Sequence, residues 1–138
     1  MNITDVEENK DEIKCRLQDI FNRQKELMVK YHEIEKKNGL LQTDKVPVDI
    51  DGHLGQQRLK DFAWRITEEL GEAMNCLKNK SWKQTHFQTD LEHYYEEISD
   101  AFHFFIELCI LSGLDAEDLY QLYYRKSMVN KFRQRSNY

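Results

Sequence analysis

The chain has 138 residues and a formal net charge of −5, with one proline, five glycines and three cysteines. That length suits a single domain, expected over residues 1–138, that is large enough to bury a hydrophobic core. The acidic balance argues against a general nucleic-acid-binding surface, and the longest apolar stretch, residues 101–114, is too short to span a bilayer.

The cysteines and the first residues indicate a cellular compartment. Cys15, Cys76 and Cys109 are odd in number and lack CxxC spacing, which is typical of free thiols in a reducing environment. The N-terminal segment is acidic and lacks the apolar core of a signal peptide. We therefore expect a cytoplasmic protein with no membrane attachment.

The first predicted helix covers residues 6–37, a segment that contains neither glycine nor proline and repeats apolar residues at helical spacing. Asn38 and Gly39 form a typical C-terminal stop. Residues 39–56 hold Pro47 and are expected to form a loop.

Two further helices are predicted over residues 57–78 and 90–111, joined by a polar loop over residues 79–89. The expected core stripe of the earlier helix is Phe62, Ile66, Leu70, Ala73 and Leu77. The expected core stripe of the later helix is Leu91, Tyr94, Ile98, Phe102, Phe105 and Cys109.

A fourth helix should follow Asp115, which is placed as an N-cap with Asp118 at the third helical position. The chain therefore predicts an all-α fold, an antiparallel bundle of about four main helices.

Two acidic pairs stand out on the predicted helices. Glu69 and Glu72 lie one turn apart, as do Glu97 and Asp100 on the next helix. If the two helices run antiparallel, four carboxylates can meet at one point. Such a cluster is favourable when cations neutralise it, and carboxylate oxygens select hard ions such as Mg²⁺, Mn²⁺ or Ca²⁺.

The helical wheel separates these acids from their neighbours. Glu68 points away from the apolar stripe of its helix, and Glu96 and Glu107 lie on the far side of theirs. Acidic pairs at this spacing are also common on solvated helix faces. From the residues alone, a non-catalytic helical interaction protein with solvent-facing acids is therefore an alternative interpretation.

Several segments resemble a known superfamily, the all-α NTP pyrophosphatases, which include MazG proteins and dimeric dUTPases. The ExxE and ExxD pairs are its most general feature. The segments Glu97-x-x-Asp100-x-Phe102-His103-Phe104 and Lys126-x-x-x-Asn130-x-x-Arg133-Gln134-x-x-x-Tyr138 are similar to the dimeric dUTPase and phage dCTPase–dUTPase branch. The first-helix segment Leu17-Gln18-x-x-Phe21-Asn22 and the loop pair Trp82-Lys83 resemble the same branch.

The resemblance implies a Mg²⁺-dependent enzyme, with Mn²⁺ as an alternative cofactor, that hydrolyses dUTP and also dCTP to the monophosphate and pyrophosphate. Metal binding falls to Glu69, Glu72, Glu97 and Asp100, with Glu69 or Glu72 accepting the proton of the attacking water. A MazG-like pyrophosphohydrolase of other specificity is the alternative within the superfamily.

The resemblance also assigns residues to the nucleotide. The expected base-binding residues are Gln18, Asn22, Trp82, His103 and Phe104, and the expected phosphate-binding residues are Lys83, Lys126, Asn130 and Arg133. Each has an ordinary structural alternative: solvated amides, a core phenylalanine, a packing histidine, or a basic helix end. A homodimer that shares site residues between subunits is expected, because the long first helix has few partners within so short a chain.

Overall fold

A computed structural model describes residues 15–136, which form four α-helices and no strand. In chain order these are α1 (Arg16–Lys37), α2 (His53–Asn75), α3 (Leu91–Leu111) and α4 (Ala116–Arg135). The all-α prediction is confirmed. The part of the first predicted helix before residue 15 lies outside the described residues.

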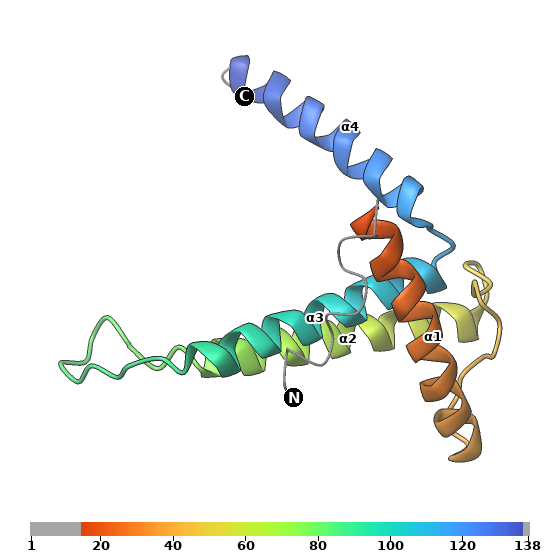
Figure 1. The fold of residues 1–138 in the computed structure, drawn as a ribbon, viewed down its shortest axis with the longest axis horizontal. Helices are drawn as coiled ribbons and strands as arrows, with labels where there is room; N and C mark the ends of the chain where they lie inside the picture. The colour runs from red at the N-terminus through yellow and green to blue at the C-terminus, as the bar shows by residue number, and fades with distance from the viewer. Residues whose placement is uncertain (1–14, 137–138) are drawn as a thin grey trace.

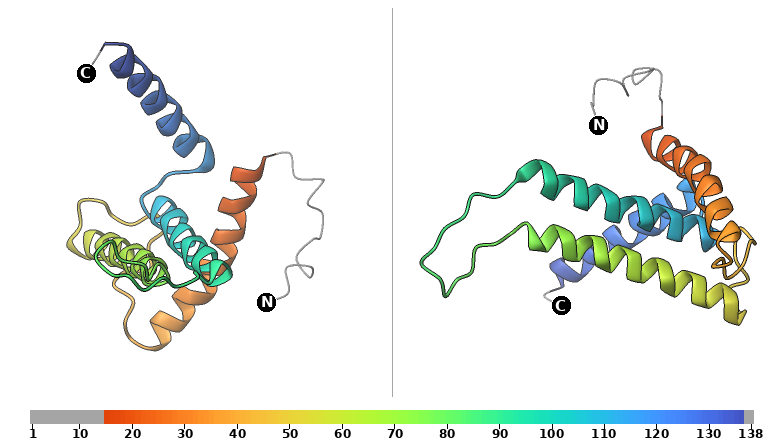
Figure 2. Two further views of the ribbon diagram at one scale, coloured as in Figure 1. Left: turned by 90° about the vertical axis from the view of Figure 1, so that its left-hand side faces the viewer. Right: turned by 90° about the horizontal axis from the view of Figure 1, so that it is seen from below.

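Helices α2 and α3 form an antiparallel hairpin and run side by side along their length (Figures 1 and 2). The loop over residues 76–90 closes the hairpin at one end, as the polar composition of this segment predicts. The Asn79 side chain holds the two halves of this loop together. Its Nδ2 donates to the Phe87 carbonyl and its Oδ1 accepts from the Phe87 N–H, both at 2.7 Å.

Helix α1 crosses the hairpin at the end opposite that loop (Figure 1). The core lies at this crossing, and its buried members are Phe21, Met28, Val48, Phe62, Ile106, Cys109, Ile110, Leu111 and Ala116. The acidic pairs are nearer the open loop, so the core anchors one end of the hairpin and leaves the other end accessible.

Helix α2 begins at His53, four residues earlier than the sequence predicts. The reason is Gly55, where a side chain would collide with the carbonyl oxygen of Asp49. Without that side chain the connection from α1 can fold directly onto the first turn of α2. The helix also ends earlier, at Asn75, because Cys76 and Leu77 donate to carbonyls three residues back and tighten the last turn.

The predicted ends of α3 and the predicted start of α4 are confirmed. The Asp90 side chain accepts from the His93 N–H at 3.2 Å and caps α3. Gly113, with φ of +88°, follows the end of α3 in the left-handed conformation that glycine favours. Asp115 and Asp118 form a reciprocal capping box at the start of α4, with hydrogen bonds of 2.7 and 3.1 Å.

The predicted core stripes are wrong for most of their members. Phe62, Ala73 and Cys109 are buried. In contrast, six members of the stripes have 39–56 % of their residue surface exposed to solvent. These are Leu70, Leu77, Leu91, Ile98, Phe102 and Phe105. The prediction assumed that the most apolar face packs inside the protomer, whereas this face lies on the outside of the hairpin. We call these six residues the hairpin face.

Glu107 is a second correction. The helical wheel places it on the far, solvated side of its helix, but it is 2 % exposed. Because the hairpin face is turned outward, the opposite side of α3 packs beneath α1 and takes Glu107 with it. The helical wheel correctly placed Glu107 on the side of α3 opposite the apolar stripe. The error was to assume that the apolar stripe, and not the side with Glu107, packs against α1.

Helix α4 extends away from the hairpin, and its contacts with the other helices are mainly with α1 (Figures 1 and 2). Ala116 is buried, and large apolar side chains along the helix are exposed: Tyr120, Leu122, Tyr123, Tyr124, Met128, Val129 and Phe132. Within residues 15–136, no helix combines the length and the hydrophobicity that crossing a membrane requires.

Candidate metal centre and nucleotide site

Helices α2 and α3 bring acidic side chains together across the hairpin. One carboxylate oxygen from each of Glu69, Glu97 and Asp100 lies within 4.8 Å of the other two. Glu69 and Asp100 are half-buried and Glu97 is buried, so water screens the three charges poorly. Three oxygen donors at this spacing form the type of site that a hard divalent cation occupies.

Glu72 lies at the exposed edge of the same cluster. A hydrogen bond with Glu97, together with the charge of Glu97, raises the pKa of Glu72 above its usual value. Glu72 therefore belongs to the same electrostatic group as the three acids whose oxygens lie close together. Their roles as metal ligands stay a prediction.

The carboxyl groups have unequal proton affinities. Loss of solvent, a hydrogen bond with Glu97 and the charges of Glu72 and Asp100 raise the pKa of Glu69 to about 7. Hydrogen bonds from Glu69 and Glu72 lower the pKa of Glu97. The cluster alone therefore retains protons near neutral pH, and they reside on Glu69 in preference to Glu97.

The neighbouring acids Glu68 and Glu96 are exposed and lie outside the cluster. This agrees with the helical wheel, which assigned both residues to solvent. His93, in contrast, was not among the predicted site residues. Its ring Nε2 lies 3.0 Å from Oε1 of Glu97, one turn further along α3. The sequence signal was a histidine four residues before a predicted ligand.

Gln18 and Asn22 lie one turn apart on α1, and both are exposed. Gln18 Nε2 donates to Asn22 Oδ1 at 2.9 Å. The pair therefore presents one amide oxygen and one amide nitrogen beyond its own hydrogen bond, which suits the edge of a polar heterocycle.

The predicted aromatic residues are not side by side. Trp82 is 76 % exposed in the loop over residues 76–90, where Lys80 lies 5.6 Å from its ring centre. Phe104 is thirteen residues beyond the start of α3, roughly 20 Å along the helix at its normal rise. Phe104 is half-buried against Phe62, and His103 beside it is exposed. The structure does not bring Trp82 and Phe104 together around one base.

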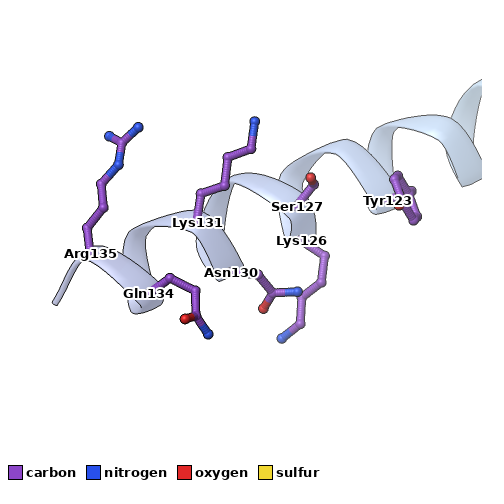
Figure 3. A pocket seen from close by; sticks show the side chains of 7 residues that line it. All are labelled: Tyr123, Lys126, Ser127, Asn130, Lys131, Gln134 and Arg135. Atoms are coloured by element: carbon purple, nitrogen blue, oxygen red, sulfur yellow. The ribbon is translucent and has the colours of Figure 1, made fainter. Parts of the chain in front are cut away.

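Three of the four predicted phosphate-binding residues are separated from the acids. Lys126, Asn130 and Arg133 are on α4, which leaves the hairpin, and Lys83 is exposed in the loop over residues 76–90. Figure 3 shows Lys126 and Asn130 extending from the same side of α4. They help to line a groove of about 490 Å³ together with Tyr123, Ser127, Lys131, Gln134 and Arg135. Within one protomer this groove and the acidic cluster are separate.

Sequence reasoning also missed a buried polar network beside the core. Arg58 is fully buried and donates from one terminal nitrogen to Glu35 at 2.9 Å and to Gln42 at 3.1 Å. Arg65 donates to Asp61 at 2.8 and 3.1 Å and lies 3.4 Å from Glu35. Glu35 thus connects α1 to two arginines of α2.

Arg65 also supports a predicted base-binding residue. Its guanidinium lies 4.4 Å from the ring centre of Phe62 and 6.0 Å from that of Phe104. The two rings meet edge to face with centres 6.1 Å apart. This contact fixes Phe104 against the core by favourable ring geometry and charge.

Glu107 and His32 complete the network. Burial raises the pKa of Glu107 to about 7, against the opposing effect of the Arg58 and Arg65 charges. His32 Nε2 lies 3.8 Å from the Glu107 carboxylate, and burial followed by the Arg58 charge lowers the pKa of His32. At neutral pH, His32 is therefore predominantly neutral, and this contact is not a strong ion pair.

An antiparallel helical hairpin with facing acidic pairs defines an all-α protein with a candidate site for a hard divalent cation. A family model described as dUTPase matches residues 16–112, more than half of the chain, and the chain belongs to this dimeric dUTPase-like family of all-α NTP pyrophosphatases. The match includes both acidic pairs and ends before α4. Neither a curated protein nor a solved structure matches the chain. At family level the protein is thus a nucleotide pyrophosphohydrolase of the dUTP and dCTP type.

Proposed function

We propose that the protein is a Mg²⁺-dependent pyrimidine deoxynucleoside triphosphate pyrophosphatase that hydrolyses dUTP, and dCTP as a second substrate, to the monophosphate and pyrophosphate. The observation that carries this proposal is the convergence of the Glu69, Glu97 and Asp100 carboxylates inside the segment that matches the dUTPase family.

The donor set fits Mg²⁺, with Mn²⁺ as an alternative. All candidate ligands are carboxylate oxygens, and Oε2 of Glu97 is buried with no hydrogen-bond donor among residues 15–136 once Glu69 and Glu72 are ionised. Glu69, Glu72, Glu97 and Asp100 would hold the ion. When bound, the ion lowers the pKa of a coordinated water and neutralises charge on the phosphates.

The chain's own residues would handle the proton and the substrate. Of the four acids, one that the ion does not fully engage, Glu69 or alternatively Glu72, would accept the proton of the attacking water. Gln18 and Asn22 would read the base edge with their amides. The remaining base contacts would come from His103 and Phe104 or, at the loop end of the hairpin, from Trp82, because Trp82 and Phe104 of one protomer do not meet around one base. The phosphate contacts would come from Lys83, Lys126, Asn130 and Arg133.

A homodimer would solve two problems of the single protomer. The hairpin face leaves large apolar side chains exposed, which a second copy would cover. Helix α4 carries Lys126 and Asn130 away from the acids of its own hairpin. We therefore propose that α4 of one subunit packs against the partner, so that these two side chains complete the partner's site.

The test of substrate is a panel of dUTP, dCTP, dTTP, dATP and dGTP assayed for pyrophosphate release with Mg²⁺ and with excess chelator. The proposal expects the highest kcat/KM for dUTP, activity on dCTP, and none with chelator. A purine preference would indicate a MazG-like specificity instead. No release from any nucleotide would indicate a non-catalytic helical protein.

A further inference from the structure

We propose that His93 is a positioning residue for Glu97, holding one carboxylate oxygen so that the other stays turned toward Glu69 and Asp100. The proposal rests on the proposed function for its use of a bound cation. Its geometric basis is the 3.0 Å distance between His93 Nε2 and Glu97 Oε1. Because an ionised carboxylate only accepts hydrogen bonds, the His93 N–H is the donor.

The start of α3 fixes the backbone of His93. The Asp90 side chain accepts the His93 N–H at 3.2 Å, which holds this residue at the third position of the helix. Glu97 follows four residues later, and helical side chains lean toward the N-terminus of their helix. The Glu97 carboxylate is therefore directed back toward the His93 ring.

The contact leaves one Glu97 oxygen for the cluster. His93 takes Oε1, while Oε2 is buried and accepts from no donor among residues 15–136 as long as Glu69 and Glu72 are ionised. Glu97 as a whole is 8 % exposed. A buried acceptor of this kind, beside two further carboxylates, is costly unless a cation satisfies it.

Repulsion between the clustered carboxylates would turn the Glu97 side chain away from the metal site. Asp100 carries the same charge as Glu97, as does Glu69 once it has lost its proton, and a glutamate side chain has several rotamers with which to avoid them. The hydrogen bond from His93 opposes that movement before any ion arrives. Groups that orient metal ligands in this way typically change metal affinity by roughly 10- to 100-fold when they are removed.

The test compares three variants by direct Mn²⁺ binding to the full chain, measured by calorimetry without nucleotide. His93→Ala should weaken Mn²⁺ binding at least roughly tenfold. His93→Gln should stay within a few-fold of wild type, because the glutamine amide nitrogen can replace Nε2 as donor. His53→Ala removes another exposed histidine from the first turn of a helix and should leave affinity unchanged.

Three results would overturn the proposal. Wild-type affinity in His93→Ala would show that Glu97 needs no support. A nitrogen coupling in pulsed EPR of the Mn²⁺-loaded wild type that disappears in His93→Ala would make His93 a ligand rather than a positioning residue. Absence of Mn²⁺ binding by wild type would remove the proposed function and, with it, the role of His93. Helical content measured by circular dichroism should be equal in all four proteins.

Discussion

Glu69 and Glu97 meet across the α2–α3 hairpin, and a hydrogen bond between them shifts the pKa values of their carboxyl groups in opposite directions. Glu69 keeps its proton to about pH 7, whereas the pKa of Glu97 lies below the usual value for a glutamate. A cation that binds both must displace that proton, which makes binding dependent on pH.

The first prediction concerns this dependence. Below pH 7, Glu69 is protonated and its proton competes with the metal ion. The Mn²⁺ affinity should therefore rise with pH and level off above pH 7. For one group with a pKa of about 7, Mn²⁺ affinity should be about tenfold weaker at pH 6 than at pH 8. Calorimetry in two buffers of different ionisation enthalpy should detect the released proton at pH 6. Equal affinities at the two pH values would contradict the pKa assigned to Glu69.

The second prediction compares acids that differ in position but not in chemistry. Glu97→Gln and Asp100→Asn should abolish nearly all turnover, because each removes a charged oxygen ligand. Glu96→Gln should retain most of it, because Glu96 is exposed outside the cluster. Glu69→Gln and Glu68→Gln form the same contrast on α2.

Both sets of variants should keep their helical content, and unfolding of the metal-free Glu97→Gln and Asp100→Asn proteins should be no easier than for wild type, since repulsion is relieved. The measurements are steady-state pyrophosphate release and urea unfolding followed by circular dichroism. A Glu68→Gln protein as inactive as Glu69→Gln would mean that the wrong face of α2 had been assigned to the site.

The third prediction concerns the buried Glu107. Its pKa in the folded protein, about 7, is above the usual value of 4.5. Between these values the native state binds more protons than the unfolded state, so this group lowers stability as pH rises from about 4.5 to 7. Glu107→Gln should remove that loss, and the variant should gain stability relative to wild type between pH 5 and pH 8.

The expected relative gain is on the order of 2 kcal/mol, because the pKa of about 7 already includes the opposing effect of the arginine charges. Urea unfolding of both proteins at each pH measures it, and the comparison cancels contributions from unchanged groups such as Glu69. A constant difference between the two proteins over this range would show that Glu107 is ionised throughout.

The fourth prediction separates the two ends of the nucleotide site. Lys126→Ala should lower kcat/KM by roughly ten- to a hundredfold, because a charged hydrogen bond to phosphate contributes about 1.5–3 kcal/mol. The loss should be equal for all accepted nucleotides, which share their phosphates. Gln18→Ala or Asn22→Ala should change the ratio of dUTP to dCTP activity, since those substrates differ at the base edge. A Lys126→Ala enzyme that lost activity on one base only would reverse this assignment.

The fifth prediction tests the shared site. If α4 completes the partner's site, a mixture of Lys126→Ala and Asp100→Asn chains should regain activity, because each mixed dimer has one site with both residues intact. Random reassociation should restore about a quarter of wild-type turnover. Each variant alone should stay low. A mixture with no more activity than the average of its components would place Lys126 in the site of its own subunit.

The sequence was sufficient for the features that depend on local chemistry. Asp115 formed the expected N-cap, with Asp118 completing a capping box, and the polar loop before α3 appeared where predicted. The acidic pairs met because i, i+3 spacing and an antiparallel turn determine that geometry almost completely. Glu68 and Glu96 pointed to solvent for the same reason.

The features that depend on tertiary contacts could not be predicted in this way. A helical wheel locates an apolar face but does not say whether the same chain covers it, so Phe102 and Phe105 were assigned to the core although they are exposed. Arg58 and Glu107 were unexpected because a buried charge requires partners from other helices, here Glu35 and His32 of α1. His93 was missed because its proposed role comes from a hydrogen bond to the Glu97 side chain, and that bond is known only once the side chains have been placed.

The most direct measurement of the central claim is the conversion of dUTP by the purified chain, with dUMP and pyrophosphate quantified separately. With Mg²⁺, wild type should release the two products in equal amounts, and Asp100→Asn or excess chelator should suppress both. Full turnover by Asp100→Asn at ordinary Mg²⁺, or release of inorganic phosphate in place of pyrophosphate, would contradict the account.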